Sequence, residues 1–501
     1  MSRPLRVFAA GLFAASATFT AACGRHANSG SDVASQGGAA VDAGSAGDSD
    51  AGSPPDGGPV ADAGSPPDAG SAPDGGPATD ACVAPDAGAP PALEVLPCPA
   101  TPPVLWRRTF SHVDVSFGGA ADENGNLYWV EYDPPWSYQN PDPPAFLVSA
   151  NSNDGQNRYR VSAPGSTVGS FMLADGNVVL SQGLVVTAYA AATGARSWSL
   201  DLTSARPTGY DGIGWMTDLG DGRIAFTRYS NSEGSTTLYV VDGSSGTVVW
   251  STASPAYQVL GSNGTGLMLV ASNASTSYSP YETIADVSVL DSSGRETWKD
   301  RIAYSRFLGW TPARPWLAVP ENQGICSTAK YTAAPAWWGQ TMGANLGFAF
   351  SFGTGAQTPD NVQVFRGESM IGIGPLAGSN PEDGLAVFPF LAGDHLDMLG
   401  QAWHSQPALC YPSAPRAAWF ARVDATSLYQ CPLSLGGGIE AAALLPGRLI
   451  VGWRNYLSYA CGDHLNPVTI EAYALPGESL AKSGWVQWGG SPGGGNRPRA
   501  P

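Results

Sequence analysis

The sequence predicts an all-β protein, a single β-propeller of seven or eight four-stranded blades that follows a signal peptide and a disordered linker. Three observations point to this fold class. Glycine (63 residues) and proline (42 residues) are abundant while only 13% of the residues are charged, which is typical of many short strands joined by tight turns. Asn-Gly and Asp-Gly pairs stand beside β-rich runs, which is a strong hairpin signal. A strand–turn–strand unit also recurs every ~40–50 residues, which is the repeat length of a propeller blade.

The first residues have the pattern of an export signal. Arg3 and Arg6 precede an apolar run that ends at Ala22, and this run is shorter than the roughly 20 residues that cross a membrane. Residues 1–22 are therefore predicted to be a signal peptide. Thr20-Ala21-Ala22-Cys23 resembles a bacterial lipobox, except that Thr20 replaces the usual leucine. We expect Cys23 to carry a lipid; an ordinary signal peptide would leave it as a free thiol.

Residues 23–95 are predicted to form a disordered tether rich in Asp, Pro, Gly and Ala. Large apolar side chains are almost missing there, so the segment cannot offset the entropy of ordering. The aspartates lack the glycine and carboxylate positions of a calcium loop. The acidic positions are Asp32, Asp42, Asp48, Asp50, Asp56, Asp62, Asp68, Asp74, Asp80 and Asp86.

The formal net charge of −17 argues against nucleic acid as a partner, because phosphate binding needs a basic face.

Seven cysteines are an odd number for an oxidising compartment. If Cys23 is lipidated, six remain for three disulfides: Cys82, Cys98, Cys326, Cys410, Cys431 and Cys461. Six cysteines allow about 15 connectivities, which the sequence does not resolve. Cys82 with Cys98 is the simplest local pairing, and it would fix the end of the tether to the folded domain.

Four units share a turn glycine and, four residues later, a large aromatic side chain. The pairs are Gly155 with Tyr159, Gly194 with Trp198, Gly246 with Trp250, and Gly294 with Trp298. The GSSGT turn before Trp250 offers N–H groups and hydroxyls to an anion, but its recurrence favours a structural hairpin. A tryptophan supplies about 150–250 Å² of surface that can pack one blade against the next.

Each of the four units follows an upstream turn and strand, at residues 123–132, 174–183, 220–229 and 262–272. A fifth unit spans 446–456 and 468–480. It keeps Gly447 and Gly477 but has Ala481 where the aromatic is expected. Residues 300–435 are predicted to hold two or three divergent blades, with strands in 365–374 and 417–429. We expect the propeller over residues 96–488 and a disordered tail over 489–501.

The hairpin pattern resembles the tryptophan-docking repeat of the quinoprotein-like (PQQ-like) propellers. YVVDGSSGTVVW keeps the acidic residue at Asp242, the glycine at Gly246 and the aromatic at Trp250. The other units have Asn151, Ala190 and Asp291 at the acidic position. The resemblance extends in fold and anchoring to the propeller lipoprotein of outer-membrane assembly. We expect the Asp and Asn side chains at this position to bond backbone N–H groups across the turn while the aromatic docks the blade.

The same family includes dehydrogenases that use PQQ and calcium and typically carry a vicinal cysteine pair. This chain has no Cys-Cys dipeptide and no haem-attachment motif, so we expect no cofactor. Asp394, His395 and Asp397, with His404 nearby, offer ligand types for a metal or a general base. A polar loop in a divergent blade is the simpler interpretation.

Several aromatic residues lie outside the repeat positions and are candidates for a ligand-binding face. They are Trp136, Tyr138, Trp310, Trp316, Trp337, Trp338 and Trp403; packing between blades is the alternative. We therefore expect an exported cell-envelope lipoprotein whose propeller is a non-catalytic binding or scaffolding module. Its expected partners are envelope proteins or glycans. Its expected location is the outer membrane, at the periplasmic or surface face. The competing class is an enzyme on the same scaffold, either a quinoprotein-type dehydrogenase or a hydrolase.

Overall fold

A computed structural model describes residues 91–480 with internal gaps. Cys23 and the predicted signal peptide, most of the tether and the C-terminal tail lie outside the described residues. The gaps are residues 136–142, 164–167, 204–210, 231–234, 255–257, 277–282, 305, 311–314, 319–324, 328–340, 343–345, 352–360, 367–368, 377–382, 405–414 and 455–466. Among the described residues, no helix is long and apolar enough to cross a membrane.

The described chain folds into eight β-sheets, which we number as blades 1 to 8. Blade 1 contains β3 (Asp114–Ala121), β4 (Asn126–Tyr132), β5 (Ala145–Asn151) and β6 (Asn157–Ala163). Blade 2 contains β7 (Val168–Ala174), β8 (Asn177–Gln182), β9 (Val185–Ala190) and β10 (Arg196–Asp201). Blade 3 contains β11 (Gly212–Asp218), β12 (Arg223–Ser230), β13 (Ser235–Asp242) and β14 (Val248–Ser254). Blade 4 contains β15 (Gln258–Ser262), β16 (Leu267–Thr276), β17 (Thr283–Asp291) and β18 (Glu296–Tyr304).

The remaining blades are less regular. Blade 5 contains β19 (Arg306–Trp310), β20 (Pro315–Ala318) and β21 (Ile325–Ser327). Blade 6 contains β22 (Thr341–Met342), β23 (Gly347–Ser351), β24 (Asn361–Arg366) and β25 (Ser369–Pro375). Blade 7 contains β26 (Asp383–Ala392), β27 (His395–His404), β28 (Pro415–Val423) and β29 (Ser427–Leu433), with β1 (Glu94–Leu96) added at its edge. Blade 8 contains β30 (Gly438–Leu445), β31 (Arg448–Arg454), β32 (Val468–Ala474) and the N-terminal β2 (Val104–Phe110).

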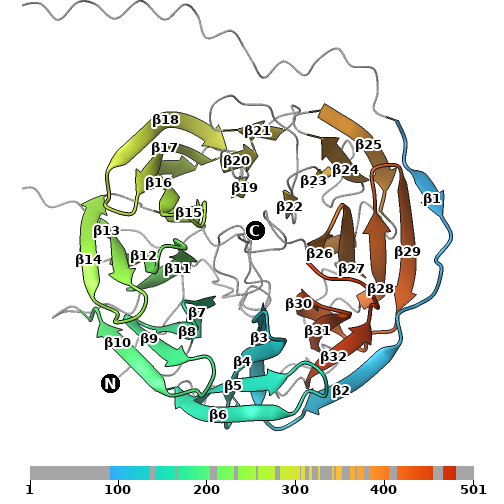
Figure 1. Cartoon of the computed structure of the whole chain (residues 1–501), viewed down its shortest axis with the longest axis horizontal. Helices are drawn as coiled ribbons and strands as arrows, with labels where there is room; N and C mark the ends of the chain where they lie inside the picture. The colour runs from blue at the N-terminus through green and yellow to red at the C-terminus, as the bar shows by residue number, and fades with distance from the viewer. Residues whose placement is uncertain are drawn as a thin grey trace, which may run out of the picture. The chain divides into compact units, whose positions relative to one another are not determined.

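The first strand of each blade lies at the centre and contacts the first strands of both neighbouring blades. These contacts run from β3 through β7, β11, β15, β19, β22, β26 and β30, and then return to β3, so they form a closed cycle (Figure 1). The predicted all-β propeller is confirmed, with eight sheets in the described chain.

Burial follows the position of each strand within its blade. All six residues of β8, an inner strand, are buried, because neighbouring blades cover both faces of the sheet. In the outer strand β6, exposed residues instead alternate with the partly buried Tyr159 and Val161 and the buried Ala163, since the second face of the strand meets solvent. Small hydrophobic clusters therefore lie between successive blades, such as the one that joins Trp198 of blade 2 to Phe226 of blade 3.

An N-terminal strand closes the ring. β2 pairs antiparallel with β32, with Trp106 opposite Ala472 and Phe110 opposite Val468. The outer strand of the last blade is thus supplied by the beginning of the folded chain. The fifth sequence unit lacks an aromatic because its outer strand is β2, and Trp106 provides the aromatic that was expected at Ala481.

The predicted pairing of Cys82 with Cys98 is wrong, because Cys98 forms a disulfide with Cys431. The two Cα atoms are 5.0 Å apart although the cysteines are 333 residues apart in sequence. β1 causes this proximity: it pairs in parallel with β29, with Leu96 opposite Tyr429, which brings Cys98 beside Cys431. The spacing of the cysteines in the sequence therefore does not predict this disulfide.

In the divergent region, two stretches that were predicted as strands each include parts of two strands. Residues 365–374 include the end of β24 and most of β25, and residues 417–429 include most of β28 and the start of β29. Asp424 closes the second turn by accepting hydrogen bonds from the backbone N–H groups of Thr426 and Ser427, both at 2.7 Å. A β-rich run that is interrupted only by such a turn is easily read as one strand.

The alternating strand directions give the ring two different faces. Connections from first to second strand and from third to fourth strand lie at one face, which we call the turn face; residues 175–176 and 393–394 are examples. Connections from second to third strand begin and end at the opposite face, which we call the loop face. Several of these connections are long, as in residues 133–144 between β4 and β5, and 455–467 between β31 and β32, whereas only residues 183–184 join β8 to β9.

Candidate functional site

The repeat residues meet across the boundaries between blades. Trp198, on the outer strand β10 of blade 2, donates a hydrogen bond from Nε1 to the carbonyl oxygen of Gly243 in blade 3, at 2.8 Å. Its ring lies against Gly246, where a Cβ would stand only 2.5 Å from the indole. Gly246 has a φ of 71°. The glycine is therefore required twice, by the turn geometry and by the ring that packs on it.

The same contact recurs at three other boundaries. Trp250 donates to Ser292 O at 2.8 Å and packs against Gly294. The Tyr159 hydroxyl donates to Ala191 O at 3.1 Å, and Gly194 faces its ring. Trp106 of the ring-closing strand donates to Ser152 O at 2.8 Å and faces Gly155. Trp298 is at the equivalent position of β18, and Gly477 has a φ of 84° in the turn after β32.

The acidic position of the repeat organises the turn itself. Asp242 Oδ1 accepts hydrogen bonds from the N–H groups of Ser244 at 3.1 Å and Ser245 at 2.8 Å. The hydroxyl and N–H groups of these serines lower the pKa of Asp242. Asp291 accepts from Ser293 N–H at 2.9 Å, and Asn151 accepts from Asn153 N–H at 2.8 Å. In the Asp242 turn, the donors that an anion would need are already bonded to a carboxylate.

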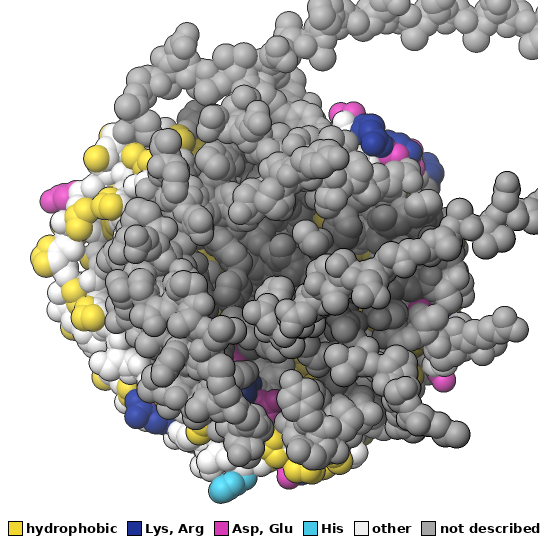
Figure 2. Space-filling model, turned by 180° about the vertical axis from the view of Figure 1, so that it is seen from behind, with side chains coloured by type: hydrophobic (Ala, Val, Ile, Leu, Met, Phe, Trp, Pro, Cys, Tyr) yellow, Lys and Arg dark blue, Asp and Glu magenta, His cyan; other side chains and the backbone are white. Residues whose placement is uncertain are grey.

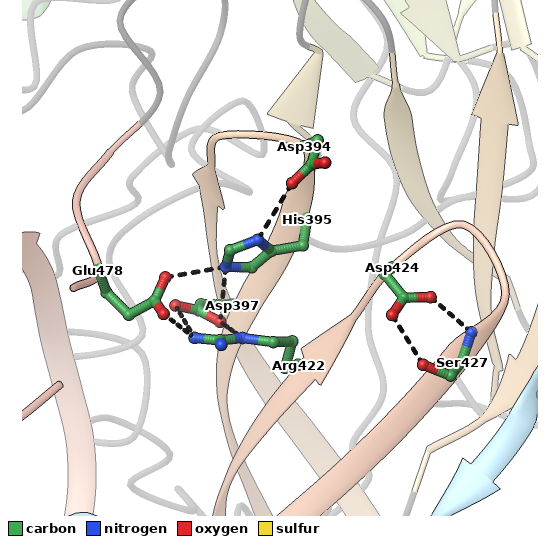
Figure 3. Close-up of polar contacts among 7 residues, drawn as sticks. All are labelled: Asp394, His395, Asp397, Arg422, Asp424, Ser427 and Glu478. Carbon is green, nitrogen blue, oxygen red and sulfur yellow. Dashed lines mark hydrogen bonds and ion pairs between the residues drawn. The ribbon is translucent and has the colours of Figure 1, made fainter. Parts of the chain in front are cut away.

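A cluster of charged side chains joins blades 7 and 8 at the turn face (Figure 3). This interblade cluster consists of His395 and Asp397 on β27, Arg422 on β28 and Glu478 in the turn after β32. Arg422 Nε is 2.8 Å and Nη2 is 3.2 Å from the two oxygens of Asp397. Arg422 Nη2 is also 2.7 Å from Glu478 Oε1, across the blade boundary. His395 Nε2 completes the cluster at 2.9 Å from Glu478 Oε2.

Burial affects the pKa values of the charged groups in the cluster. The Asp397 side chain is fully buried, while Arg422 remains 25% exposed. Burial raises the pKa of Asp397, and the hydrogen bonds from Arg422 act in the opposite direction. Burial alone would lower the pKa of Arg422, but Asp397 and Glu478 outweigh that effect and raise it, so the guanidinium stays charged.

The donor types in the cluster also suit a metal ion, because one ligand atom each from His395, Asp397 and Glu478 lie within 4.8 Å of one another. Arg422, however, already places its positive guanidinium between the two carboxylates, as Figure 3 shows. A divalent cation would have to displace these bonds. The arrangement therefore fits an internal ion-pair network that links two blades better than a metal centre.

The structure brings together only part of the candidate group that the sequence indicated. His395 and Asp397 are adjacent, Asp394 is 90% exposed and its carboxylate lies 3.5 Å from His395 Nδ1. The His404 side chain lies outside the described residues. Sequence reasoning missed Arg422 and Glu478, which reach the cluster from another strand and another blade. Local spacing contains no signal for either of them.

A second charged group lies at the other boundary of blade 8. Arg454 on β31 bonds Glu440 on β30, and its Nη1 is 2.8 Å from Asp114 Oδ1 on β3 of blade 1. Arg454 Nη2 also donates to Val115 O at 3.0 Å. Both boundaries of the ring-closing blade thus contain a partly buried arginine with two carboxylate partners.

The candidate ligand-face aromatics are largely outside the described residues, which include no part of Trp136, Tyr138, Trp337 or Trp338. The backbone of Trp403 lies in β27, opposite Gly384 and Pro415. Trp310 ends β19, and Trp316 lies in β20 opposite Gly309. The side chains of these three residues are not among those described.

Comparison with known proteins bears on the repeats. The family model described as outer membrane protein assembly factor BamB matches residues 100–279 and 182–319. Blades 1 to 4, which lie within the matched residues, carry PQQ-like repeats. The matched residues include the four docking hairpins of blades 1 to 4 and the ring-closing strand β2, and they stop within blade 5. No curated protein sequence matches the chain.

Solved structures with similar folds are propellers of low sequence identity. The β-propeller domain of the trilobed protease from Pyrococcus furiosus is 11% identical, with 74% of this chain and 96% of that chain covered at a TM-score of 0.42. BamB from Moraxella catarrhalis is 10% identical, with 76% and 100% covered at a TM-score of 0.30. The Dos1 propeller is 11% identical, with 73% and 78% covered at a TM-score of 0.34.

Proposed function

We propose that this protein is exported, is anchored by a lipid on Cys23, and presents its propeller as a non-catalytic binding or scaffolding module in the cell envelope. The N-terminal sequence supports export and anchoring through its basic start, its short apolar run and the Thr20–Cys23 motif. The match to the family model of BamB, an outer membrane protein assembly factor, supports a role in the envelope.

The observation that carries the binding role is the contrast between the two faces. At the turn face, the described polar residues of the repeats and of the interblade cluster bond one another. The second-to-third-strand connections all begin and end at the loop face. Trp136 and Tyr138 belong to one of them, between β4 and β5. Aromatic residues supply much of the binding energy at protein interfaces, so we place the partner surface at the loop face.

The partner is an envelope protein or a glycan, and retention by the full chain tests this. Wild-type protein immobilised through its C-terminus is mixed with envelope extract, and retained proteins and glycans are quantified. We expect Trp136→Ala with Tyr138→Ala to reduce retention of a specific partner. Lys299→Ala on the outer strand β18 is the matched control and should leave retention unchanged. Equal retention by all variants, or retention of nothing by the wild type, contradicts the proposal.

The anchor and the absence of catalysis have separate tests. Mass spectrometry of the mature N-terminus should show a diacylglyceryl cysteine at position 23, and Cys23→Ser should release the protein from membranes. An unmodified Cys23 contradicts lipid anchoring. The wild-type protein should not oxidise alcohols or sugars in the presence of PQQ, Ca²⁺ and a dye acceptor. Turnover in that assay would establish the dehydrogenase instead.

A further inference from the structure

One short N-terminal segment contacts four consecutive blades. We call residues 91–110 the clasp. It begins at blade 6, where Leu93 N–H donates to Ile373 O at 2.8 Å and Ile373 N–H donates to Pro91 O at 3.1 Å. The Leu93 side chain is 5% exposed and packs on Gly372 and Gly374, where a Cβ would lie 2.6 and 3.0 Å from it. Glycines at these two positions of β25 therefore make room for Leu93.

The clasp then passes blade 7 and blade 8. β1 pairs in parallel with β29, and the Cys98–Cys431 disulfide follows two residues after β1. Cys431 is fully buried. The chain then turns back to form β2 on β32, where Arg107 pairs with the buried Glu471. Figure 1 shows β1 and β2 following one another along the outside of these blades.

The clasp ends on blade 1. Trp106 donates to Ser152 O, and Arg108 Nη1 donates to Gly155 O at 3.1 Å. These contacts hold the boundary between the last and the first blade, where the ring is closed by residues from the two ends of the folded chain. Loss of β2 would remove both the outer strand of blade 8 and Trp106, the tryptophan that docks onto blade 1.

Exposed apolar side chains of the clasp do not hold it in place. Val95, Val104 and Leu105 are 62%, 46% and 50% exposed. Figure 2 shows hydrophobic side chains on the rim at its left, the side on which β1 lies. The clasp is therefore held by backbone pairing, by the side chains of Leu93, Trp106, Arg107 and Arg108, and by the disulfide at Cys98.

We propose that the Cys98–Cys431 disulfide isolates the ring-closing strand β2 from disturbance of the chain that precedes it. Detachment from the N-terminal side begins at Leu93 and β1, and it must pass Cys98 before it reaches β2. With the disulfide formed, a pull on the preceding chain is carried by β29 of blade 7. Without it, the pull passes to β2 and opens the ring. The source of that pull is the lipid-anchored tether, so the physiological role rests on the proposed function.

Hydrogen exchange on the full chain tests the isolation without a membrane or a partner. Leu93→Asp loosens the start of the clasp, and it is made both in the wild type and in the Cys98→Ala/Cys431→Ala background. With the disulfide present, we expect faster exchange only for amides of residues 93–96. In the Cys98→Ala/Cys431→Ala background, amides of β2 and β32 should also exchange about tenfold faster or more, because local opening now extends to them.

Val95→Asp is the matched control, because this exposed neighbour should leave exchange in β2 unchanged in both backgrounds. Leu93→Ala replaces Leu93→Asp if the charged variant does not fold. An equal acceleration of β2 in both backgrounds, or no acceleration in either, overturns the proposal. Neither outcome depends on lipidation or partner retention, so failure here is distinct from failure of the proposed function.

Discussion

The contact between Trp198 and Gly246 gives a quantitative test of how the blades are joined. Replacing Gly246 with alanine has two separate costs. A non-glycine residue at a φ of 71° costs about 1–2 kcal/mol. The new Cβ would also stand 2.5 Å from the Trp198 ring, and relieving such an overlap typically costs about 1–3 kcal/mol. We expect Gly246→Ala to lower the free energy of unfolding by about 2–5 kcal/mol.

The chain contains its own control for the backbone cost. Gly176 also has a φ of 71°, but no atom lies within 4 Å of the position that its Cβ would take. Gly176→Ala should therefore cost only the backbone contribution of about 1–2 kcal/mol. The difference between the two glycine variants measures the overlap with the indole.

A double-mutant cycle separates the contributions further. Trp198→Ala should cost about 3–5 kcal/mol, because the side chain is 7% exposed and its N–H bond to Gly243 is lost. In that background Gly246→Ala meets no ring, so the double variant should be more stable than additivity predicts by about 1–3 kcal/mol. Urea denaturation followed by tryptophan fluorescence and circular dichroism provides the free energies. Strict additivity, or equal costs at Gly176 and Gly246, would refute docking of the ring on the glycine.

Three further predictions concern other contacts. Trp250→Ala should destabilise the protein by about 3 kcal/mol, at the low end for large-to-small changes because the ring is only partly buried, and thermal denaturation measures this. Asp242→Ala should reduce stability at neutral pH but not at low pH: hydrogen bonds depress the folded-state pKa, so the stabilisation is present above about pH 4 and lost as the pH falls through the depressed value. Asp242→Asn keeps a side-chain oxygen that accepts these hydrogen bonds but does not titrate, so its stability relative to the wild type should vary less with pH than that of Asp242→Ala. Urea denaturation at several pH values measures both. Arg422→Met should cost about 3–5 kcal/mol because it leaves Asp397 buried without its cation, and adding Asp397→Asn should restore part of the loss; equal stability of the single variant and the wild type would show that the network does not join the blades.

The parts of the fold that sequence reasoning predicts are those encoded within a few residues. A turn glycine followed by an aromatic, as at Gly246 and Trp250, specifies a hairpin locally, and its recurrence specifies the propeller. The fifth unit departs from the repeat because Ala481 stands where the aromatic is expected. Trp106, which comes from the beginning of the folded chain, supplies that aromatic once β2 pairs with β32. Pairing of β2 with β32 depends on closure of the whole ring, for which no local pattern exists.

The interblade cluster and the disulfide show the same limit. His395 and Asp397 are two residues apart and are easily noticed, whereas Arg422 and Glu478 join them through strand pairing and blade packing. Cys98 meets Cys431 because three residues of β1 pair with β29. Such short strands have little sequence signature, so the nearest cysteine was the natural but incorrect partner.

The docking contact has the same form at four successive boundaries, from blade 8 to blade 1 and on to blade 4. Blades 1 to 3 each offer an aromatic ring to the next blade and a glycine-containing turn to the previous one, so the two sides of such a blade are complementary to each other. A tandem copy of one whole repeat would meet a matching surface on both sides. Rings of this type can therefore gain or lose a blade by gene duplication or deletion without a new interface, and only the clasp has to be refitted to the altered circumference.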